Sequence, residues 1–536
     1  MPTPKFTPGA QLFPITLTTP AFQGVNLEQQ ASILGREWAT LLDNAVFDDA
    51  GRPATRKGWT TITGTAGAGI IKRLFEYYKA DGTSEMIAST DATIYDSLAS
   101  TPVDIDGGLT ITDGNIKFVN FNDKVIAFGI GTGGIPAVRT TGNFADITVN
   151  SGTAPTSGIG TAAYGRLWAV DTDGKTLRYS ALLDETRWDS ADGGGSIDMS
   201  QVWPAGQDDI VAVEEFNGDL VIFGSNNTVV ATDGTASALG IEPTDLFVSD
   251  TIPGMGALTQ FGIVRTVGDL WVLTDTGVVG LKRELVQRST PITNLSKNQQ
   301  SQIIKWIDTE SDINDITMTY SPVHSFVVIN FPTSDKQLIY DTRLPMQDGT
   351  FRATTWTSQL QTAHYERSGK RLLGSLTDAV GEVMNYANFD DNGTSFIFDY
   401  ESGWLDLGEE LNVLLKFVKR LTSFVFVQQN TQVTHKVKYD FGSSTFSLAK
   451  AIVGAKTIEW GLFEWGSNGV WNINDTTAVA GTDIAEWSGS VTIKTLDAPL
   501  GGSGQYIKVG VSVNTSSGSF ALQQLNLYAK VGRLST

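Results

Sequence analysis

The chain has 536 residues, of which 41% are hydrophobic and only 18% charged, and it contains no cysteine. Disulfide bonds, thiolate metal sites and cysteine nucleophiles are therefore excluded. The formal net charge of −20 argues against a protein that grips the nucleic-acid backbone, because such binding needs clustered Lys and Arg. The length predicts two or three folding units.

The first 60 residues differ from the rest of the chain. They are rich in proline and have no apolar stretch typical of a signal sequence, so we expect a soluble protein that is not exported. No apolar run approaches the roughly 20 residues of a membrane-spanning helix. Between Glu28 and Asn44, helical spacing relates five apolar residues: Ile33, Leu34, Trp38, Leu41 and Leu42. An amphipathic helix is one interpretation of this segment, and an extended arm that crosses a neighbouring surface is the other.

Seven segments further along the chain share one pattern, in which a turn residue is followed by a hydrophobic strand. They are 82–88, 122–128, 165–170, 218–223, 268–273, 325–331 and 369–374, and their starts lie 40 to 57 residues apart. This spacing is typical of β-propeller blades, because a four-stranded blade uses about 40 to 50 residues. The repeat predicts a platform for binding or assembly, and any chemistry must be argued from particular residues.

Predicted turns and one predicted helix interrupt the strands of the repeat region. The pairs Asp81-Gly82, Asp173-Gly174, Asp233-Gly234 and Asn392-Gly393 predict hairpin tips. The segment 294–308 has no turn signal in its middle, and we expect a helix there, capped near Ser296.

After residue 400 the repeat is lost. An apolar stretch from Val413 to Val427 and later long strands up to Lys530 predict a β-sandwich. Four tryptophans belong either to its core or to an exposed aromatic surface: Trp460, Trp465, Trp471 and Trp487. We therefore predict a mainly β protein with an N-terminal arm (1–60), an irregular β-propeller with an inserted helix (61–400) and a C-terminal β-sandwich (401–536).

The residues that could carry chemistry form no recognisable set. His324, His364 and His435 are far apart and lack the spacing of metal ligands. The stretch 129–134 matches G-x-G-x-x-G, but a predicted strand follows it where a dinucleotide site needs a helix, so we expect a hairpin tip.

Two acidic motifs have structural interpretations. The stretch 172–176 resembles the aspartate boxes of sialidase propellers, which are turns. The pairs Asp208-Asp209 and Glu214-Glu215 are adjacent in sequence and point to opposite faces of a strand, so neither is a preformed glycosidase pair. We assign no catalytic, cofactor-binding or metal-binding residue, expect no cofactor, and predict that the protein is not an enzyme.

One succession of segments is more specific than the repeat. It runs through 165–170, 177–188, 210–224, 252–257 and 268–278, and then the expected helix, 320–332 and 338–341. This order resembles the propeller of packaged-DNA stabilisation proteins, the tail hub or nozzle proteins of short-tailed bacteriophages. Gly24-Val-Asn26 and Arg56-Lys-Gly-Trp59 also look like the entry segment of such proteins. The resemblance covers roughly residues 20–390 and leaves the C-terminal part unplaced.

The resemblance implies a structural virion protein of the phage tail, assembled in the bacterial host cytoplasm. Family members form a six-fold ring below the portal–adaptor (head-to-tail connector) proteins, so this chain would be a homohexamer that extends the DNA channel. They help to retain packaged DNA until ejection, and they anchor tail fibre, spike or needle proteins. Phage DNA would pass through the lumen without specific binding. Six copies would carry 6 × −20 = −120 formal charges, of which only those facing the lumen would act on DNA at physiological salt.

Two other interpretations stay open. A propeller of this kind is also compatible with a glycan-binding or glycan-hydrolysing protein that acts on a cell surface, and with a general protein-binding platform. Glycan binding or hydrolysis by the purified chain would favour the first, and a cellular genome without portal or adaptor genes nearby would favour the second.

Overall fold

The computed structural model describes residues 12–62, 69–96, 102–203, 206–233, 241–281, 294–375, 378–385, 388–406, 414–427, 431–451, 492–515 and 519–532. These residues are mainly β, with one α-helix, which confirms the predicted fold class. They form two compact units. Unit 1 takes its described residues from 1–59, 352–356 and 384–536, and unit 2 takes them from 60–351 and 357–383.

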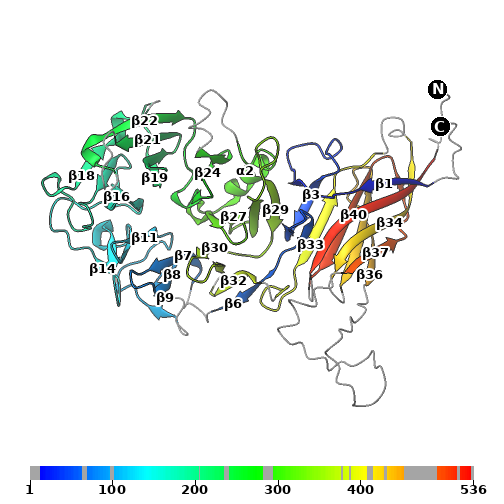
Figure 1. Cartoon of the computed structure of the whole chain (residues 1–536), viewed down its shortest axis with the longest axis horizontal. Helices are drawn as coiled ribbons and strands as arrows, with labels where there is room; N and C mark the ends of the chain where they lie inside the picture. The colour runs from blue at the N-terminus through cyan, green and yellow to red at the C-terminus, as the bar shows by residue number, and fades with distance from the viewer. Residues whose placement is uncertain are drawn as a thin grey trace, which may run out of the picture. The chain divides into compact units, whose positions relative to one another are not determined.

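Unit 2 is a β-propeller, a ring of small antiparallel sheets (Figure 1). Its first four sheets are β7 (Ile71–Tyr78) to β10 (Val103–Asp104), β11 (Phe118–Phe121) to β14 (Ala145–Asp146), β15 (Gly160–Ala163) to β18 (Gly195–Asp198), and β19 (Ile210–Phe216) to β22 (Leu246–Pro253). The intervening strands are β8 (Ser84–Thr90), β9 (Ile94–Asp96), β12 (Lys124–Ala127), β13 (Ala137–Arg139), β16 (Arg166–Val170), β17 (Thr176–Tyr179), β20 (Asp219–Gly224) and β21 (Asn227–Asp233).

Three further strand sets close the ring. The fifth sheet contains β23 (Ile263–Arg265), β24 (Leu270–Thr274) and β25 (Gly277–Gly280). Next come the consecutive strands β26 (Thr317–Ser321), β27 (Phe326–Phe331) and β28 (Lys336–Asp341). The last sheet contains β30 (Thr362–Glu366), β31 (Arg371–Ser375) and β32 (Val380–Asn385), together with β6 (Gly58–Thr61). The first strands of most neighbouring sets lie side by side, β19 contacts the 3-10 turn (Gln260–Gly262) that precedes β23, and β30 returns to β7.

All seven repeated segments occupy the same place in these sets. Each begins at the tip between the first and second strands and continues into the second strand: β8, β12, β16, β20, β24, β27 and β31. The tips use left-handed backbone, for example at Gly82 (φ 85°) and at Asn122 (φ 44°), as turn chemistry requires. The repeat seen in the sequence is therefore the first hairpin of each blade.

Apolar residues fill the space between neighbouring sheets. Ile87 and Val125 belong to a buried cluster between the first and second sheets. Trp168 and Ile222 belong to another cluster, between the third and fourth sheets. Each blade therefore buries its faces against the next blade, which is why the repeat forms a ring.

The inserted helix is α2 (Gln300–Thr309), which precedes β26. The expected cap near Ser296 was wrong, because the helix begins four residues later and Gln299 occupies its N-cap position. The Ser296 hydroxyl instead accepts a hydrogen bond from Val278 N (2.9 Å) and donates one to Asn294 Oδ1 (2.5 Å). Its oxygen therefore binds the backbone at the start of β25.

Unit 1 is a β-sandwich. One sheet has the order β37 (Thr492–Ala498), β34 (Lys416–Val427), β40 (Phe520–Val531), β5 (Pro53–Thr55) and β4 (Ala45–Phe47), with β1 (Phe13–Leu17) on β40 and β38 (Ser503–Gly504) on β34. The other has the order β29 (Arg352–Trp356), β3 (Trp38–Asp43), β33 (Ile397–Ser402), β39 (Ile507–Asn514), β35 (Gln432–Tyr439) and β36 (Phe446–Ala451), with β2 (Gly24–Val25) on β3. The rings of Phe398 and Phe520 meet between the sheets, 5.1 Å apart.

The N-terminal segment is part of this sandwich. Of the two interpretations of 28–44, the extended one is observed, because Trp38–Asp43 is strand β3. Thr40 Oγ1 donates to Ser402 O (2.9 Å), and the Ala39 and Leu42 side chains are fully buried. Helical spacing was misleading here because β3 buries residues three positions apart around an irregular register. The four tryptophans at 460, 465, 471 and 487 lie outside the described residues.

Candidate functional site

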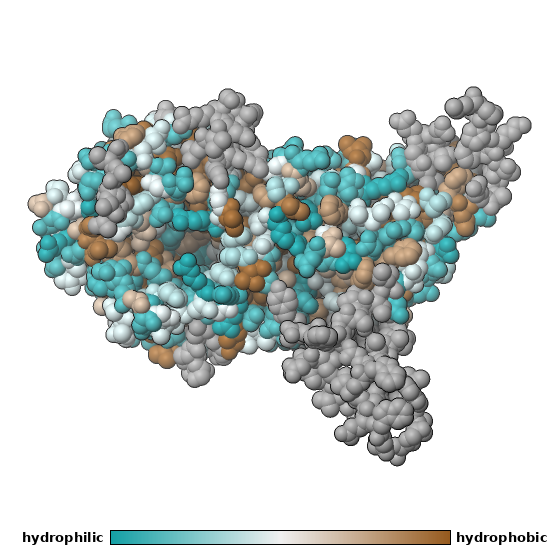
Figure 2. Space-filling view, viewed as in Figure 1, coloured by the Kyte–Doolittle hydropathy of each residue, from teal (hydrophilic) through white to brown (hydrophobic). Residues whose placement is uncertain are grey.

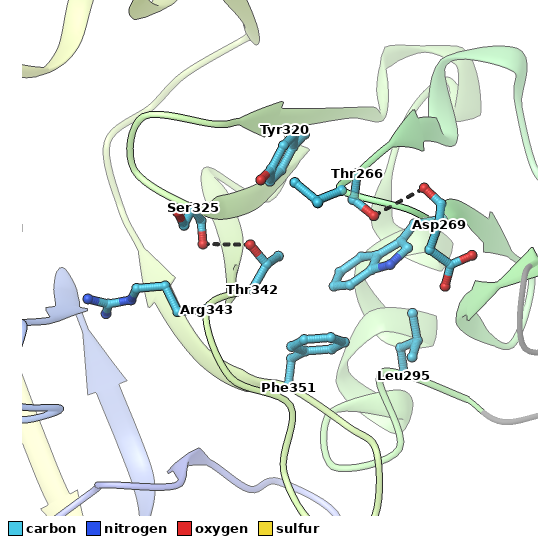
Figure 3. Close-up of a pocket in the computed structure, with 10 residues that line it drawn as sticks. Thr266, Asp269, Leu295, Tyr320, Ser325, Thr342, Arg343 and Phe351 are labelled. Carbon is cyan, nitrogen blue, oxygen red and sulfur yellow. Dashed lines mark hydrogen bonds between the residues drawn. The ribbon is translucent and has the colours of Figure 1, made fainter.

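A pocket of about 280 Å³ lies in unit 2, between the fifth sheet and the strands β26–β28. The residues that line it come from two blade hairpins and from the segments that follow β25 and β28 (Figure 3). They are Thr266, Val267, Asp269, Trp271, Leu295, Tyr320, Ser325, Thr342, Arg343 and Phe351. We take this pocket as the candidate functional site, because concave sites with convergent polar groups are where ligands bind.

The first wall is the tip of the β23–β24 hairpin. Thr266 closes the tip by donating its N–H (2.9 Å) and its hydroxyl (3.1 Å) to the carbonyl oxygen of Asp269. Asp269 Oδ1 accepts a hydrogen bond from Leu270 N (2.8 Å). A Cβ atom at Gly280 would lie 2.4 Å from Asp269 Oδ2, so glycine at this position leaves room for the carboxylate. Both side chains are therefore held in place by their own hairpin.

The floor is aromatic. The buried Trp271 ring lies 5.0 Å from the ring of Phe351 and 5.9 Å from that of Tyr340, both at angles typical of favourable aromatic pairs. Leu295 is also buried, while Phe351 is partly exposed. The pocket therefore has a rigid apolar base with one accessible ring.

The opposite wall is the tip of the β26–β27 hairpin. Ser325 has left-handed backbone (φ 54°), and its carbonyl oxygen accepts hydrogen bonds from Thr342 N (2.9 Å) and Thr342 Oγ1 (2.8 Å). Because the protons of Thr266 and Thr342 are used in this way, their hydroxyl oxygens keep lone pairs that accept hydrogen bonds. Figure 3 shows these hydrogen bonds, with Thr266 beside Asp269 and Thr342 beside Ser325.

One guanidinium lies at the rim. Arg343 donates from Nε to Asp341 Oδ1 and from Nη2 to Asp341 Oδ2, each at 2.9 Å, in a bidentate pair. Among the lining residues, Asp269 is the one acidic group and Arg343 the one basic group, and the charge of Arg343 is already balanced by Asp341. The pocket therefore suits a neutral ligand better than a strongly charged one.

A second polar cluster bridges the axis of the propeller. Asn115 Nδ2 donates to Asp315 Oδ1 (2.9 Å), and Lys72 Nζ pairs with Asp315 Oδ2 (2.7 Å). These residues precede or begin the first strands of three different sheets, and the second sheet is not a neighbour of β26 in the ring. Contacts between non-adjacent blades must cross the centre of the ring.

Two further contacts lie at the same end of the inner strands. Gln260 Nε2, before the fifth sheet, donates to Gly158 O (2.9 Å), before the third. The guanidinium of Arg73, at the start of β7, lies 3.7 Å from the centre of the Phe261 ring. Burial lowers the pKa of Arg73 to about 9, and the Asp315 charge opposes that decrease. The axial opening is therefore bridged at this end by the propeller's own side chains.

The three histidines lie in separate places. His364 is in β30 near the Phe75 ring (6.3 Å), His435 is in the sandwich core, and His324 stacks on Phe326 at a hairpin tip (5.2 Å). His364 and His435 are therefore strand residues, and His324 is a loop residue. Burial lowers the pKa of all three, to about 4 for His364 and His435.

The acidic pairs also have separate surroundings. Glu214 binds Lys117 (2.7 Å), whereas Glu215 faces Arg265 (3.6 Å), as the alternation of a strand predicts. The buried Asp208 carboxylate accepts hydrogen bonds from three backbone N–H groups of the turn at 225–227 and from the Asn227 side chain, at 2.9–3.0 Å. This structural role was not visible in the sequence.

The two turn motifs fold as expected. In the G-x-G-x-x-G stretch, a short 3-10 turn (Thr132–Gly134) connects β12 to the next strand, β13, where a dinucleotide site would need a helix. Asp173 accepts hydrogen bonds from Lys175 N (2.9 Å) and from the N–H (2.9 Å) and hydroxyl (2.7 Å) of Thr176. It is therefore a structural turn, as in an aspartate box.

The sequence did not single out the pocket residues. Trp271 stands in the fifth repeated segment and Ser325 begins the sixth, where they were interpreted as strand and turn residues. The signal that was available is the repeat itself, because it places equivalent tips of successive blades next to each other.

Comparisons with known proteins give weak likenesses. No family model matches the sequence, and no curated protein matches it. The WD40 domain of Neurospora crassa Pan2 is 9% identical, with a TM-score of 0.36 over 63% of this chain and 98% of that one. An exo-β-1,3-galactanase from Phanerochaete chrysosporium, solved with galactose, is 7% identical, with a TM-score of 0.28 over 83% of this chain and 100% of that one. The module TmCBM61, solved with β-1,4-galactotriose, is 15% identical, with a TM-score of 0.15 over 25% of this chain and 63% of that one.

Among the helices of the described residues, none has the length and apolar character needed to cross a membrane.

Proposed function

We propose that the protein is a structural, non-enzymatic component of a short-tailed bacteriophage tail, a hub or nozzle protein. In this role six copies form a ring below the portal–adaptor proteins, extend the DNA channel, help to retain packaged DNA until ejection and anchor tail fibres, spikes or needles. The proposal places the chain in the virion tail, after assembly in the host cytoplasm.

The observation that carries this proposal is the order of the blade hairpins. The segments whose succession resembles packaged-DNA stabilisation proteins are β16, the region around β17, the β19–β20 hairpin, the end of β22 with the residues up to Ala257, the β24–β25 hairpin and the strands after α2. They are consecutive parts of one propeller, so this succession follows a single folded unit, whereas the two entry segments of the resemblance belong to unit 1.

The bridged axis is consistent with a ring of copies. The contact between Asn115 and Asp315 crosses the centre of the propeller, and so does the ion pair between Lys72 and Asp315. In the proposed assembly DNA therefore passes through the lumen between copies and not along the axis of any one propeller. An acidic wall would keep DNA from adhering during ejection, because the chain carries a formal charge of −20.

Immunogold electron microscopy of phage particles that encode this chain tests the proposal. We expect gold at the tail vertex, and six-fold density there in a symmetric reconstruction. If neither intact nor gently disrupted particles carry label, while the same antibody detects the chain in the lysate, the tail role is wrong.

A further inference from the structure

We propose that the pocket between the β23–β24 and β26–β27 hairpins binds one pyranose ring of a carbohydrate. This inference goes beyond a structural role in a tail and does not depend on it. It rests on the size of the pocket, the nature of its floor and the hydrogen-bonding groups of its two walls.

The size of the pocket limits the ligand to a small one. Its volume of about 280 Å³ lies just below the roughly 300–1,000 Å³ of pockets that enclose drug-sized ligands. A single sugar ring is therefore a suitable occupant, and the rest of a longer glycan would extend into solvent past the exposed tip residue Val267, which is 86% exposed.

The floor offers an apolar surface to one side of such a ring. Phe351 is partly exposed and packs against Trp271, which fixes the plane of its ring. The C–H face of a pyranose is apolar, and aromatic rings are the side chains that bury such a face with little loss of conformational entropy.

The walls offer partners for the hydroxyl groups at the edge of the ring. The Thr266 and Thr342 hydroxyls donate to backbone carbonyl oxygens and so present lone pairs to donors from the ligand. An apolar side chain from a partner protein would remove these oxygens from water without replacing their hydrogen bonds, which carries a free-energy penalty. A sugar hydroxyl satisfies them, and the chemistry of the walls therefore favours a carbohydrate.

The charges of the lining agree with a neutral ligand. The bidentate pair with Asp341 holds the Arg343 guanidinium, and the Asp269 carboxylate is held over Gly280. An ion-paired guanidinium attracts an anionic ligand less strongly than an isolated one, so the lining does not select for a charged ligand.

Saturation-transfer-difference NMR of the full-length chain with free glucose, galactose, mannose and N-acetylglucosamine tests this proposal. We expect at least one of these sugars to receive saturation on its ring protons, with a dissociation constant of about 1 mM, as befits a single small ring. Absence of transfer to all four sugars overturns the proposal.

Variants localise the binding. Phe351→Ala and Thr342→Val each remove one element of the pocket, and we expect each to weaken binding about tenfold or more. The matched control is Phe446→Ala, which removes a half-exposed aromatic ring in unit 1 and leaves binding unchanged. The melting temperature of every variant is measured to show that it is folded. Binding that survives both pocket substitutions, or that is lost with Phe446→Ala, places the sugar elsewhere and refutes the assignment.

This test is independent of the proposed tail role. Labelling of phage particles shows where the chain is located, whereas the NMR experiment shows whether the pocket binds a sugar. Either proposal can therefore fail while the other holds.

Discussion

Ser423 Oγ lies 2.8 Å from His435 Nε2 in the core of the sandwich, and both side chains are fully buried. The pair joins β34 of one sheet to β35 of the other. A hydrogen bond between the sheets at this depth is sensitive to the protonation state of the imidazole, because burial disfavours the charged form.

A decrease in pH should therefore destabilise unit 1 through the protonation of His435. Its pKa falls from 6.5 to about 4 in the folded chain, because of burial. A depressed histidine pKa contributes stability that is fully present above pH 6.5 and is lost as the pH falls from 6.5 towards 4. The loss is about 3 kcal/mol over that range.

Urea unfolding at pH 7.5 and pH 5.0 measures this effect. We expect His435→Gln to show a smaller decrease in the urea midpoint of unit 1 on acidification than the unsubstituted chain. His324 and His364 are present in both proteins, so their contribution cancels. An identical pH dependence of the two midpoints would contradict the role assigned to His435.

The carboxylate of Asp208 should contribute far more to the stability of unit 2 than the carboxylate of Asp209. Replacement by Asn puts an amide N–H group among the donors of 225–227, so we expect Asp208→Asn to destabilise unit 2 by about 2–3 kcal/mol. The control is Asp209→Asn, at an exposed position, with an expected change within about 0.5 kcal/mol. Thermal unfolding followed by circular dichroism compares them, and equal melting temperatures would count against the network.

Gly256 is required by a close approach between two backbone segments. A Cβ atom there would lie 2.1 Å from Ser225 O and 2.6 Å from Asn226 N, so Gly256→Ala must displace the chain. We expect a destabilisation of about 2 kcal/mol or more, by calorimetry. Gly158→Ala is the matched control, since nothing lies within 4 Å of its added methyl group. A Gly256→Ala variant as stable as the unsubstituted chain would contradict this prediction, because it would show that the two backbone segments move apart at little cost in free energy.

Among the ion pairs in the described part of unit 1, the pair of Arg56 with Asp391 has the most buried cation. Its guanidinium donates to Asn44 Oδ1 (3.0 Å) and to both oxygens of Asp391, and it lies 3.8 Å from the centre of the Phe396 ring. Removal of Asp391 leaves that charge buried, so we expect Asp391→Ala to cost about 3 kcal/mol or more.

An exposed ion pair provides the comparison for Arg56. Arg187 lies 3.4 Å from Asp184, and its side chain is 51% exposed. We expect Arg187→Ala to change the free energy of unfolding by less than about 1 kcal/mol. Denaturant titration of Asp391→Ala and Arg187→Ala gives the free energy of unfolding of each variant. Similar decreases in the two variants would mean that burial does not determine how much an ion pair contributes to stability.

The propeller was predictable because its signal is repeated and local. A tip residue followed by an apolar strand recurs in every blade, and the seven predicted segments are seven such hairpins. Trp38–Asp43 was ambiguous, since the strand partners that decide its conformation lie in β33, more than 350 residues away. Long-range pairing of that kind leaves no local pattern.

The pocket was not predictable for a related reason. Thr266 and Thr342 are ordinary hairpin residues in the sequence, and they become one site only when the fifth sheet lies beside β26–β28. The helix start was missed because Ser296 uses its hydroxyl on Val278, a contact that competes with capping.

The pairing of β1 with β40 determines when unit 1 can finish folding during synthesis. Phe13 pairs with Ala529, so a strand made early and a strand made more than 500 residues later share one sheet. A ribosome completes every blade before it releases β40, and until then β1 lacks its partner and β5 pairs only with β4. The sandwich therefore closes last, and a message that stops short of β40 would yield a propeller whose companion unit never forms.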